Sequence, residues 1–153
     1  MSVEENKKVL QRYFDELFNN LDYSKADEII HEDFTYSWGG GFKGVEGHKQ
    51  HTADLHSRIS NLQARILDMA VEENKAVVLG EMTGIHVKES IGIPATNKSF
   101  SYRYANVLEF KDGKIVRLST EIVRDMLSVY QQLGVLHSTK EIIRQYKEAN
   151  NLE

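Results

Sequence analysis

Histidine, carboxylate and phenol side chains are the groups of this chain that could carry proton chemistry. The sequence contains six histidines, 23 acidic residues and seven tyrosines, but no cysteine. The lack of cysteine excludes disulfides, thiolate nucleophiles and zinc–thiolate sites. It leaves acid–base catalysis open, because His, Asp, Glu and Tyr side chains are sufficient for it.

One candidate set lies on a single face of a predicted strand. Residues 99–110 alternate in character, so Tyr102, Tyr104 and Asn106 point to the same side. Two phenols and an amide among apolar neighbours could orient a carbonyl group or stabilise an oxyanion. The same face could instead pack across a dimer, since tyrosines are enriched at interfaces. The alternation alone leaves both interpretations open.

Three histidines, His48, His51 and His56, fall within one predicted helix. His48 and His51 are three residues apart and can share a face. Zinc would require a third ligand, and the sequence offers no second matched cluster. We therefore expect no metal and no other cofactor, and we expect this helix to be solvated or to border a cavity.

Aromatic residues elsewhere could wall a binding site. Trp38 is the only tryptophan and precedes a run of three glycines. It could flank an aromatic ligand or simply pack in the core, since tryptophan is mostly buried. Tyr13, Phe14 and Leu17 belong to the apolar stripe of the first predicted helix, which begins at a capping box formed by residues 2–5.

The hydrophobic period predicts helices first and strands later, which is typical of an α+β fold. Short turns between the later strands favour an antiparallel meander. Residues 31–34 are expected to end the second helix, and residues 34–38 to form a short strand. The expected helices span 2–20, 24–30, 45–59, 125–133 and 138–146. The other expected strands span 62–71, 76–87, 99–110 and 114–124.

Composition narrows the class of partner and the location. The formal net charge is −4 and charged residues make up 27% of the chain, so no basic surface for nucleic acid is expected. No apolar run approaches the ~20 residues that span a bilayer, so we expect no membrane contact. The acidic start lacks the apolar core of a signal peptide, which is consistent with a cytoplasmic protein.

Several short segments together resemble the SnoaL-like polyketide cyclase (ester cyclase) family of the nuclear transport factor 2-like superfamily. Their order along the chain carries the resemblance. The segments are Glu5–Lys8, His31–Phe34, Gly44–Gly47, Thr83–His86, Ile91–Lys98, Asp112–Ile115 and Gln131–Gly134. The resemblance implies a curved antiparallel sheet wrapped around N-terminal helices, forming a cone with an internal pocket. It covers residues 1–134 and leaves 135–153 as a helical extension of the same domain.

The resemblance also implies a catalytic acid–base residue on the last strand, which corresponds here to Glu121. Burial in an apolar cone would raise the pKa of this carboxyl and suit it to proton transfer. Glu121 could instead face outward or pair with Arg117 or Arg124. Asp125 is the other carboxylate, but it fits the N-cap of the next helix.

His86, within the Thr-Gly-x-His segment, is the second catalytic candidate, as a base or as a hydrogen-bond donor to an enolate. It could instead be an edge histidine without chemistry. The substrate-binding set implied by the cone is Tyr13, Phe14, Leu17, Trp38, Leu55, Met82, Tyr102, Tyr104 and Asn106.

We therefore expect a cofactor-independent acid–base enzyme with cyclase-like, isomerase or lyase chemistry. Its substrate would be a small hydrophobic or aromatic carbonyl compound, and the chain would form a homodimer through the sheet. The family's tryptophan–aspartate pair and some of its histidines are absent here. The alternatives are a ligand-binding module without catalysis, and a dimeric interaction protein whose cone is filled by Trp38, Met82 and Tyr104.

Overall fold

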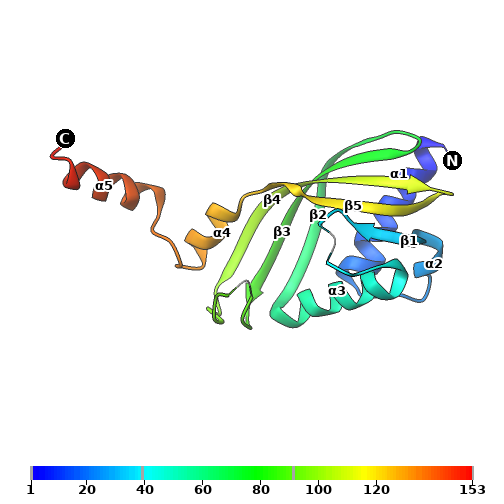
Figure 1. Cartoon of the computed structure of the whole chain (residues 1–153), viewed down its shortest axis with the longest axis horizontal. Coiled ribbons are helices and arrows are strands. Elements are labelled where there is room, and N and C mark those ends of the chain that lie inside the picture. Colours follow the sequence, from blue (N-terminus) through cyan, green and yellow to red (C-terminus); the bar gives the residue numbers. More distant parts are fainter. Residues whose placement is uncertain (1, 39, 91, 153) are drawn as a thin grey trace.

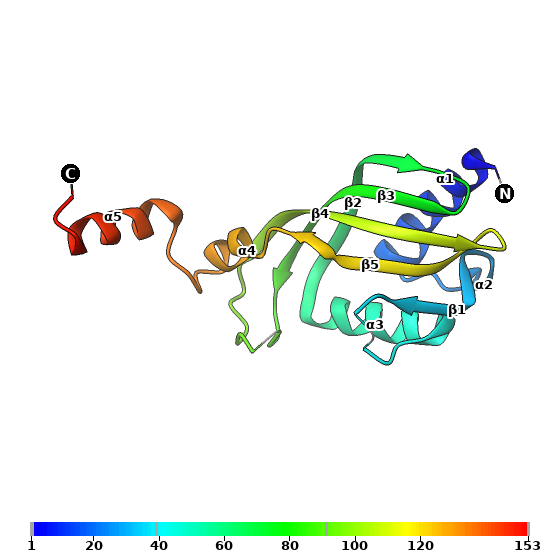
Figure 2. The ribbon, with the colours of Figure 1, turned by 45° about the horizontal axis from the view of Figure 1, so that its top comes forward.

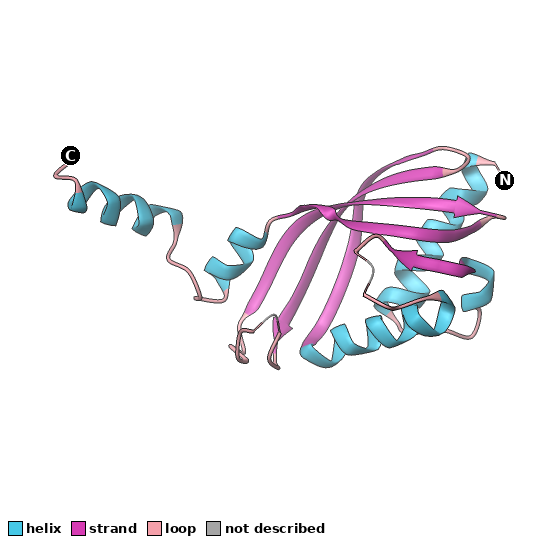
Figure 3. Ribbon diagram, in the orientation of Figure 1, coloured by secondary structure: helices cyan, strands magenta, loops and turns pink. Residues whose placement is uncertain are grey.

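The computed structural model confirms the α+β class. It describes residues 2–38, 40–90 and 92–152, apart from the side chains of 120–123. Five strands form one curved sheet in the order β1-β5-β4-β3-β2, and the helices that precede β2 in the chain lie inside its curve (Figures 1 and 3). The elements in chain order are α1 (Val3–Arg12), the π-helical segment η1 (Tyr13–Asn19), α2 (Ala26–Ile29), β1 (Ile30–Tyr36), α3 (Gly44–Arg58), β2 (Ile59–Val71), β3 (Lys75–His86), β4 (Ser99–Lys111), β5 (Lys114–Arg124), α4 (Met126–Gln132) and α5 (Thr139–Ala149).

The first helix begins at the predicted capping box and continues into η1. The Ser2 side chain accepts from the Glu5 backbone N–H, and the Glu5 carboxylate accepts from the Ser2 backbone N–H. The buried Asn6 amide donates to the carbonyl oxygens of Glu72 and Glu73, at 2.9 Å each. These bonds fix the start of α1 against the β2–β3 turn, so that its apolar stripe lies across the sheet.

The prediction that residues 31–34 end a helix is wrong. α2 has only four residues, and β1 begins at Ile30 and includes this segment. β1 pairs in parallel with β5, with Ile30 opposite Ile115. Ile30 and Phe34 are both buried, because a strand added to this edge closes the sheet over the core.

The meander is antiparallel, as predicted, and its register has two irregular places that matter here. β2 shifts register between Ile66 and Asp68, where the sequence pattern changes phase. The second register shift lies in the pairing of β4 with β5. Ala105 pairs with Val123 and Val107 pairs with Ser119, so β5 contributes extra residues between these two pairs.

The C-terminal helices differ in how they pack. Asp125 caps α4 by accepting from the Ser128 backbone N–H, and Val129 and Leu133 pack on Phe100. No residue of α5 is buried, and the helix extends away from the sheet (Figures 1 and 2). The boundary between residues 134 and 135 remains a prediction. None of the helices in the described part of the chain is long and apolar enough to cross a bilayer.

Candidate functional site

A cavity of about 680 Å³ lies between the N-terminal helices, α3 and the concave face of the sheet. This volume is within the range of small-molecule sites. Most of the lining is aromatic or aliphatic, and the polar side chains are few. The described lining residues are Tyr13, Phe14, Phe18, Tyr36, Trp38, His51, Leu55, Ile59, Leu62, Met82, Tyr102, Tyr104, Asn106, Leu118, Arg124 and Met126.

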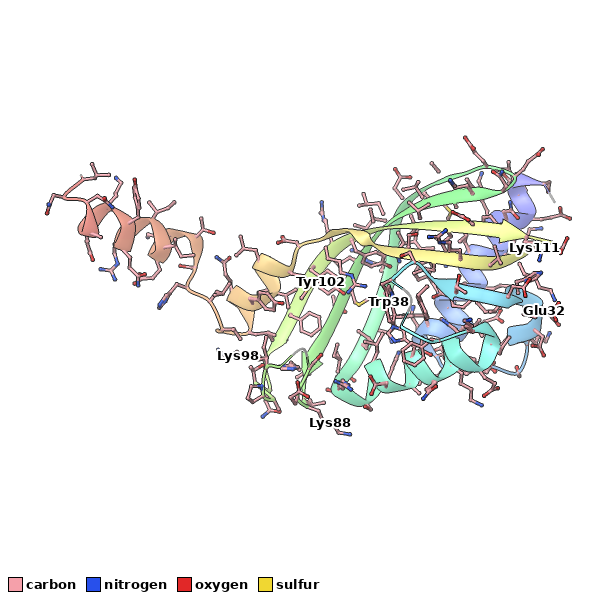
Figure 4. The ribbon with its side chains drawn as sticks, viewed as in Figure 1. Glu32, Trp38, Lys88, Lys98, Tyr102 and Lys111 are labelled. Carbon is pink, nitrogen blue, oxygen red and sulfur yellow. The ribbon has the colours of Figure 1, made fainter. Side chains whose placement is uncertain are left out.

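Every predicted binding residue lines the cavity except Leu17, which is fully buried in the core. Tyr102 on β4 and Trp38 after β1 come from different elements (Figure 4). Trp38 is 38% exposed and stacks on Tyr36, with 5.1 Å between ring centroids. The alternative of a filled cone is therefore wrong, because Trp38, Met82 and Tyr104 border an open space.

The two predicted catalytic residues have different outcomes. The side chain of Glu121 lies outside the described residues; its backbone belongs to β5, between the pairs where the register shifts. His86 is buried at the end of β3 and its Nδ1 lies 3.2 Å from Thr96 Oγ1. His86 is not among the cavity-lining residues.

His51 is an ionisable side chain of the cavity lining that was not among the predicted catalytic residues. Its ring contacts Tyr36, Trp38 and Phe42, with centroid distances of 4.8, 5.2 and 5.2 Å. Burial lowers its pKa below 6.5; the charge of Asp54 opposes this shift and that of Arg124 adds to it. The imidazole is therefore neutral at pH 7 and can accept a proton.

His48 lies behind the cavity wall and is fully buried. Its Nδ1 is 2.7 Å from the Tyr36 hydroxyl, and its Nε2 has no hydrogen-bond partner among the described residues. The rings of Tyr13 and Phe34 pack around it. Burial lowers the pKa of His48 from 6.5 to about 3, so it stays neutral in the folded protein.

This burial predicts an acid-dependent loss of stability. The pKa is lower in the folded state, so the unfolded chain binds the extra proton as pH falls from about 6.5 towards 3. The free energy of unfolding should fall by up to about 1.4 kcal/mol per pH unit in this window. Urea unfolding at pH 7 and 4.5 should show a smaller pH-dependent loss for His48→Asn than for the wild type. An equal loss would contradict the prediction, and His137→Asn, at an exposed position, should behave as wild type.

The two tyrosines of β4 differ in their hydroxyl contacts. Tyr102 donates to the Met82 sulfur at 3.0 Å. The hydroxyl of Tyr104, whose residue is 2% exposed, has no hydrogen-bond partner in the described part of the chain. Its ring crosses Gly80, the residue paired with it on β3. Burial raises the pKa of Tyr104, so its phenol remains a hydrogen-bond donor.

The remaining lining residues were missed for identifiable reasons. Tyr36 shares strand parity with Trp38, which was a usable signal. Leu118 and Arg124 are six residues apart on β5, an even spacing that puts them on one face of the strand and was a further usable signal. His56, grouped with His51 by sequence, instead bonds the Phe18 carbonyl through Nε2 at 2.8 Å.

The sequence profile of SnoaL-like polyketide cyclases matches residues 8–133, which include all the described cavity-lining residues. The chain belongs to the SnoaL-like polyketide cyclase family. This confirms the resemblance found in the sequence. A search of curated proteins finds no match to this chain.

Solved structures share the fold of this SnoaL-like chain. TsrD from Streptomyces laurentii is 23% identical, with a TM-score of 0.78 over 89% of this chain and 99% of its own. A SnoaL-like polyketide cyclase from Agrobacterium tumefaciens is 15% identical, with a TM-score of 0.74 over 84% of this chain and 98% of its own. AclR from Streptomyces galilaeus is 18% identical, with a TM-score of 0.69 over 98% of this chain and 94% of its own. The match to AclR therefore extends beyond Gly134.

Proposed function

We propose that this SnoaL-like chain is a cofactor-independent acid–base enzyme of cyclase, isomerase or lyase type. Its substrate would be a small hydrophobic carbonyl compound. The observation that carries the proposal is a neutral imidazole, His51, in an apolar cavity whose lining also includes the phenol Tyr36. A base and a donor within one cavity are the two groups that proton abstraction next to a carbonyl requires.

In the proposed reaction, the His51 imidazole accepts a proton from the carbon next to the carbonyl group. The electron pair of that C–H bond moves onto the carbonyl oxygen, forming an enolate. His51 then returns a proton to carbon for isomerisation. For cyclisation, the enolate carbon attacks a second carbonyl, whose oxygen takes the proton. Aromatic walls exclude water and strengthen the electrostatic contacts of both steps.

Glu121 remains a proposed second base, a carboxylate, on the basis of its place in the last strand. His86 is not included in the proposed mechanism, because it does not line the cavity. The family match and the fold of the solved relatives support the class of chemistry; the choice of His51 depends on its position and pKa.

Hydrogen–deuterium exchange at carbon tests the proposal without knowledge of the natural substrate. An aryl β-keto ester is incubated with the protein in D2O, and deuterium next to the ketone is measured by mass spectrometry against a buffer blank. The proposal expects exchange faster than the blank at pH 7. A series of such esters that binds in the cavity without accelerated exchange would instead indicate a ligand-binding module.

We further propose a homodimer through the outer face of the sheet. Val77 and Leu79 on β3 are 43% and 41% exposed there, and they pair with Val107 and Ala105 on β4. Such an apolar patch is typical of an interface. Sedimentation equilibrium should give twice the chain mass for the wild type and the chain mass for Leu79→Lys. A monomeric wild type would contradict the proposal.

A further inference from the structure

Arg124 is the charged side chain of the cavity lining. It ends β5, and among the described lining residues no other side chain is charged at pH 7, because the His51 imidazole is neutral. Arg124 pairs with Tyr104 across β4 and β5, so the two side chains leave the sheet on the same face. Tyr102, two residues before Tyr104 on β4, also lies on this face. The strand pairing thus directs Arg124 to the concave side of the sheet, beside the two tyrosines.

The positive charge of Arg124 acts on two other groups of the lining. Burial raises the pKa of Tyr102, and the charge of Arg124 opposes that rise. Burial lowers the pKa of His51, and the charge of Arg124 lowers it further. Tyr102 belongs to β4 and His51 to α3, so the guanidinium faces a space that the sheet and the helix both border. This agrees with the place of Arg124 in the strand pairing and in the cavity lining.

The cavity differs in character between its opening and its closed part. Arg124 and Trp38 are exposed although they line the cavity, which places them where it opens to solvent. Tyr13 and Leu62 are almost fully buried and border the closed part. A charged group bound beside Arg124 can keep some of its hydration, which lowers the cost of binding it. An apolar group deeper in the cavity gains from leaving water.

The guanidinium of Arg124 suits one kind of anion. It is planar and has five N–H donors, so it can serve more than one partner at once. Two of these donors can align with the two oxygens of a carboxylate, a geometry that a single oxyanion does not offer. Hydrogen bonds of this charged type are about twice as strong as neutral ones, and the paired geometry also fixes the orientation of the bound group.

We propose that Arg124 binds a carboxylate of the ligand at the opening of the cavity, while the apolar body of the ligand fills the part behind it. The ligand class is a hydrophobic carboxylic acid, which the cavity prefers to the neutral ester or amide of the same body. Arg124 thereby selects the ligand and determines which end enters first. The further conclusion that the substrate is an aromatic keto acid rests on the proposed function, but the binding of a carboxylate does not.

A matched pair of probes tests the carboxylate site without turnover. 2-Naphthoate is ionised at pH 7, and 2-naphthamide has nearly the same shape without the charge. Isothermal titration calorimetry should show that the wild type binds 2-naphthoate about tenfold or more tightly than 2-naphthamide. Arg124→Gln should weaken 2-naphthoate binding by about tenfold to hundredfold and keep 2-naphthamide binding within about threefold. Unchanged binding of 2-naphthamide shows that the variant keeps its fold and its cavity.

Three further variants separate this role from a general effect of charge. Arg124→Lys keeps the charge without the planar fork, so it should bind 2-naphthoate more tightly than Arg124→Gln does. Arg103→Gln removes an exposed arginine from the opposite face of β4 and should change 2-naphthoate binding by less than about threefold. Trp38→Leu removes part of the aromatic wall and should weaken both probes by similar factors, which places the bound ring in the cavity.

Three results would overturn the proposal: no preference of the wild type for 2-naphthoate, an unchanged 2-naphthoate affinity in Arg124→Gln, or equal losses in Arg124→Gln and Arg103→Gln. The second result would restrict Arg124 to interactions within the chain. Selective binding of 2-naphthoate together with no carbon exchange on the aryl β-keto ester would reject the proposed function and leave the carboxylate site standing.

Discussion

His51→Gln is expected to slow proton exchange on the aryl β-keto ester by about a hundredfold or more, since a positioned general base contributes about 10²–10⁴ in rate. Glutamine has a similar reach and cannot accept the proton at neutral pH. Affinity for the ester should change only a few-fold, because the aromatic walls remain. Rates at saturating ester and separate binding titrations distinguish the two effects.

The pH profile provides an independent check on His51. Its pKa lies below 6.5, so the wild-type rate should be level at pH 7 and fall only below pH 6.5 as the imidazole becomes protonated. His137→Gln, at an exposed position after α4, should keep both the rate and the profile. A His51→Gln protein with a wild-type rate would shift the assignment to Glu121, which Glu121→Gln would then test.

Gly80→Ala is expected to destabilise the sheet strongly. A Cβ atom at Gly80 would lie much closer to the Tyr104 ring than van der Waals contact allows. The ring cannot move without entering the cavity or the core, and such overpacking costs about 1–3 kcal/mol. Denaturant unfolding should show this loss as a lower free energy of unfolding.

A double variant isolates the cause. With Tyr104→Ala the ring is gone, and Gly80→Ala should then be neutral or stabilising, because alanine has less conformational entropy to lose than glycine in a strand, by about 0.5–1 kcal/mol. Gly80→Ala should therefore lower the free energy of unfolding of the wild type but not that of the Tyr104→Ala variant. If Gly80→Ala were equally destabilising in both backgrounds, the contact with Tyr104 would not be the reason for a glycine at this position.

The elements of the fold follow from hydrophobic period and turn residues, and the binding wall follows from the cone implied by the family. What the sequence could not supply is contact between distant side chains. His48 and Tyr36 are 12 residues apart, and nothing local indicates that one ring supports the other. His51 has the same helix spacing as a metal ligand or a solvated residue, and only the tertiary packing of Trp38 and Phe42 around it shows that it borders a cavity.

The prediction for His86 and the predicted start of β1 illustrate a second limit. His86 was selected because of a segment shared with the family, but the side chain bonds to Thr96, on the loop before β4, and does not border the cavity. The start of β1 was misread because α2 is a single turn, and a pattern of so few residues does not separate helix from strand.

The irregular pairing in β5 has a consequence for how this strand can change length. Between the pairs Ala105–Val123 and Val107–Ser119, β5 advances four residues while β4 advances two. The excess is an even number, and side chains alternate with a period of two. Leu118 before the irregularity and Arg124 after it therefore both line the cavity. When two residues are inserted or deleted here, every side chain of β5 keeps its face of the sheet. A single-residue insertion would move the side chains on one side of it to the opposite face.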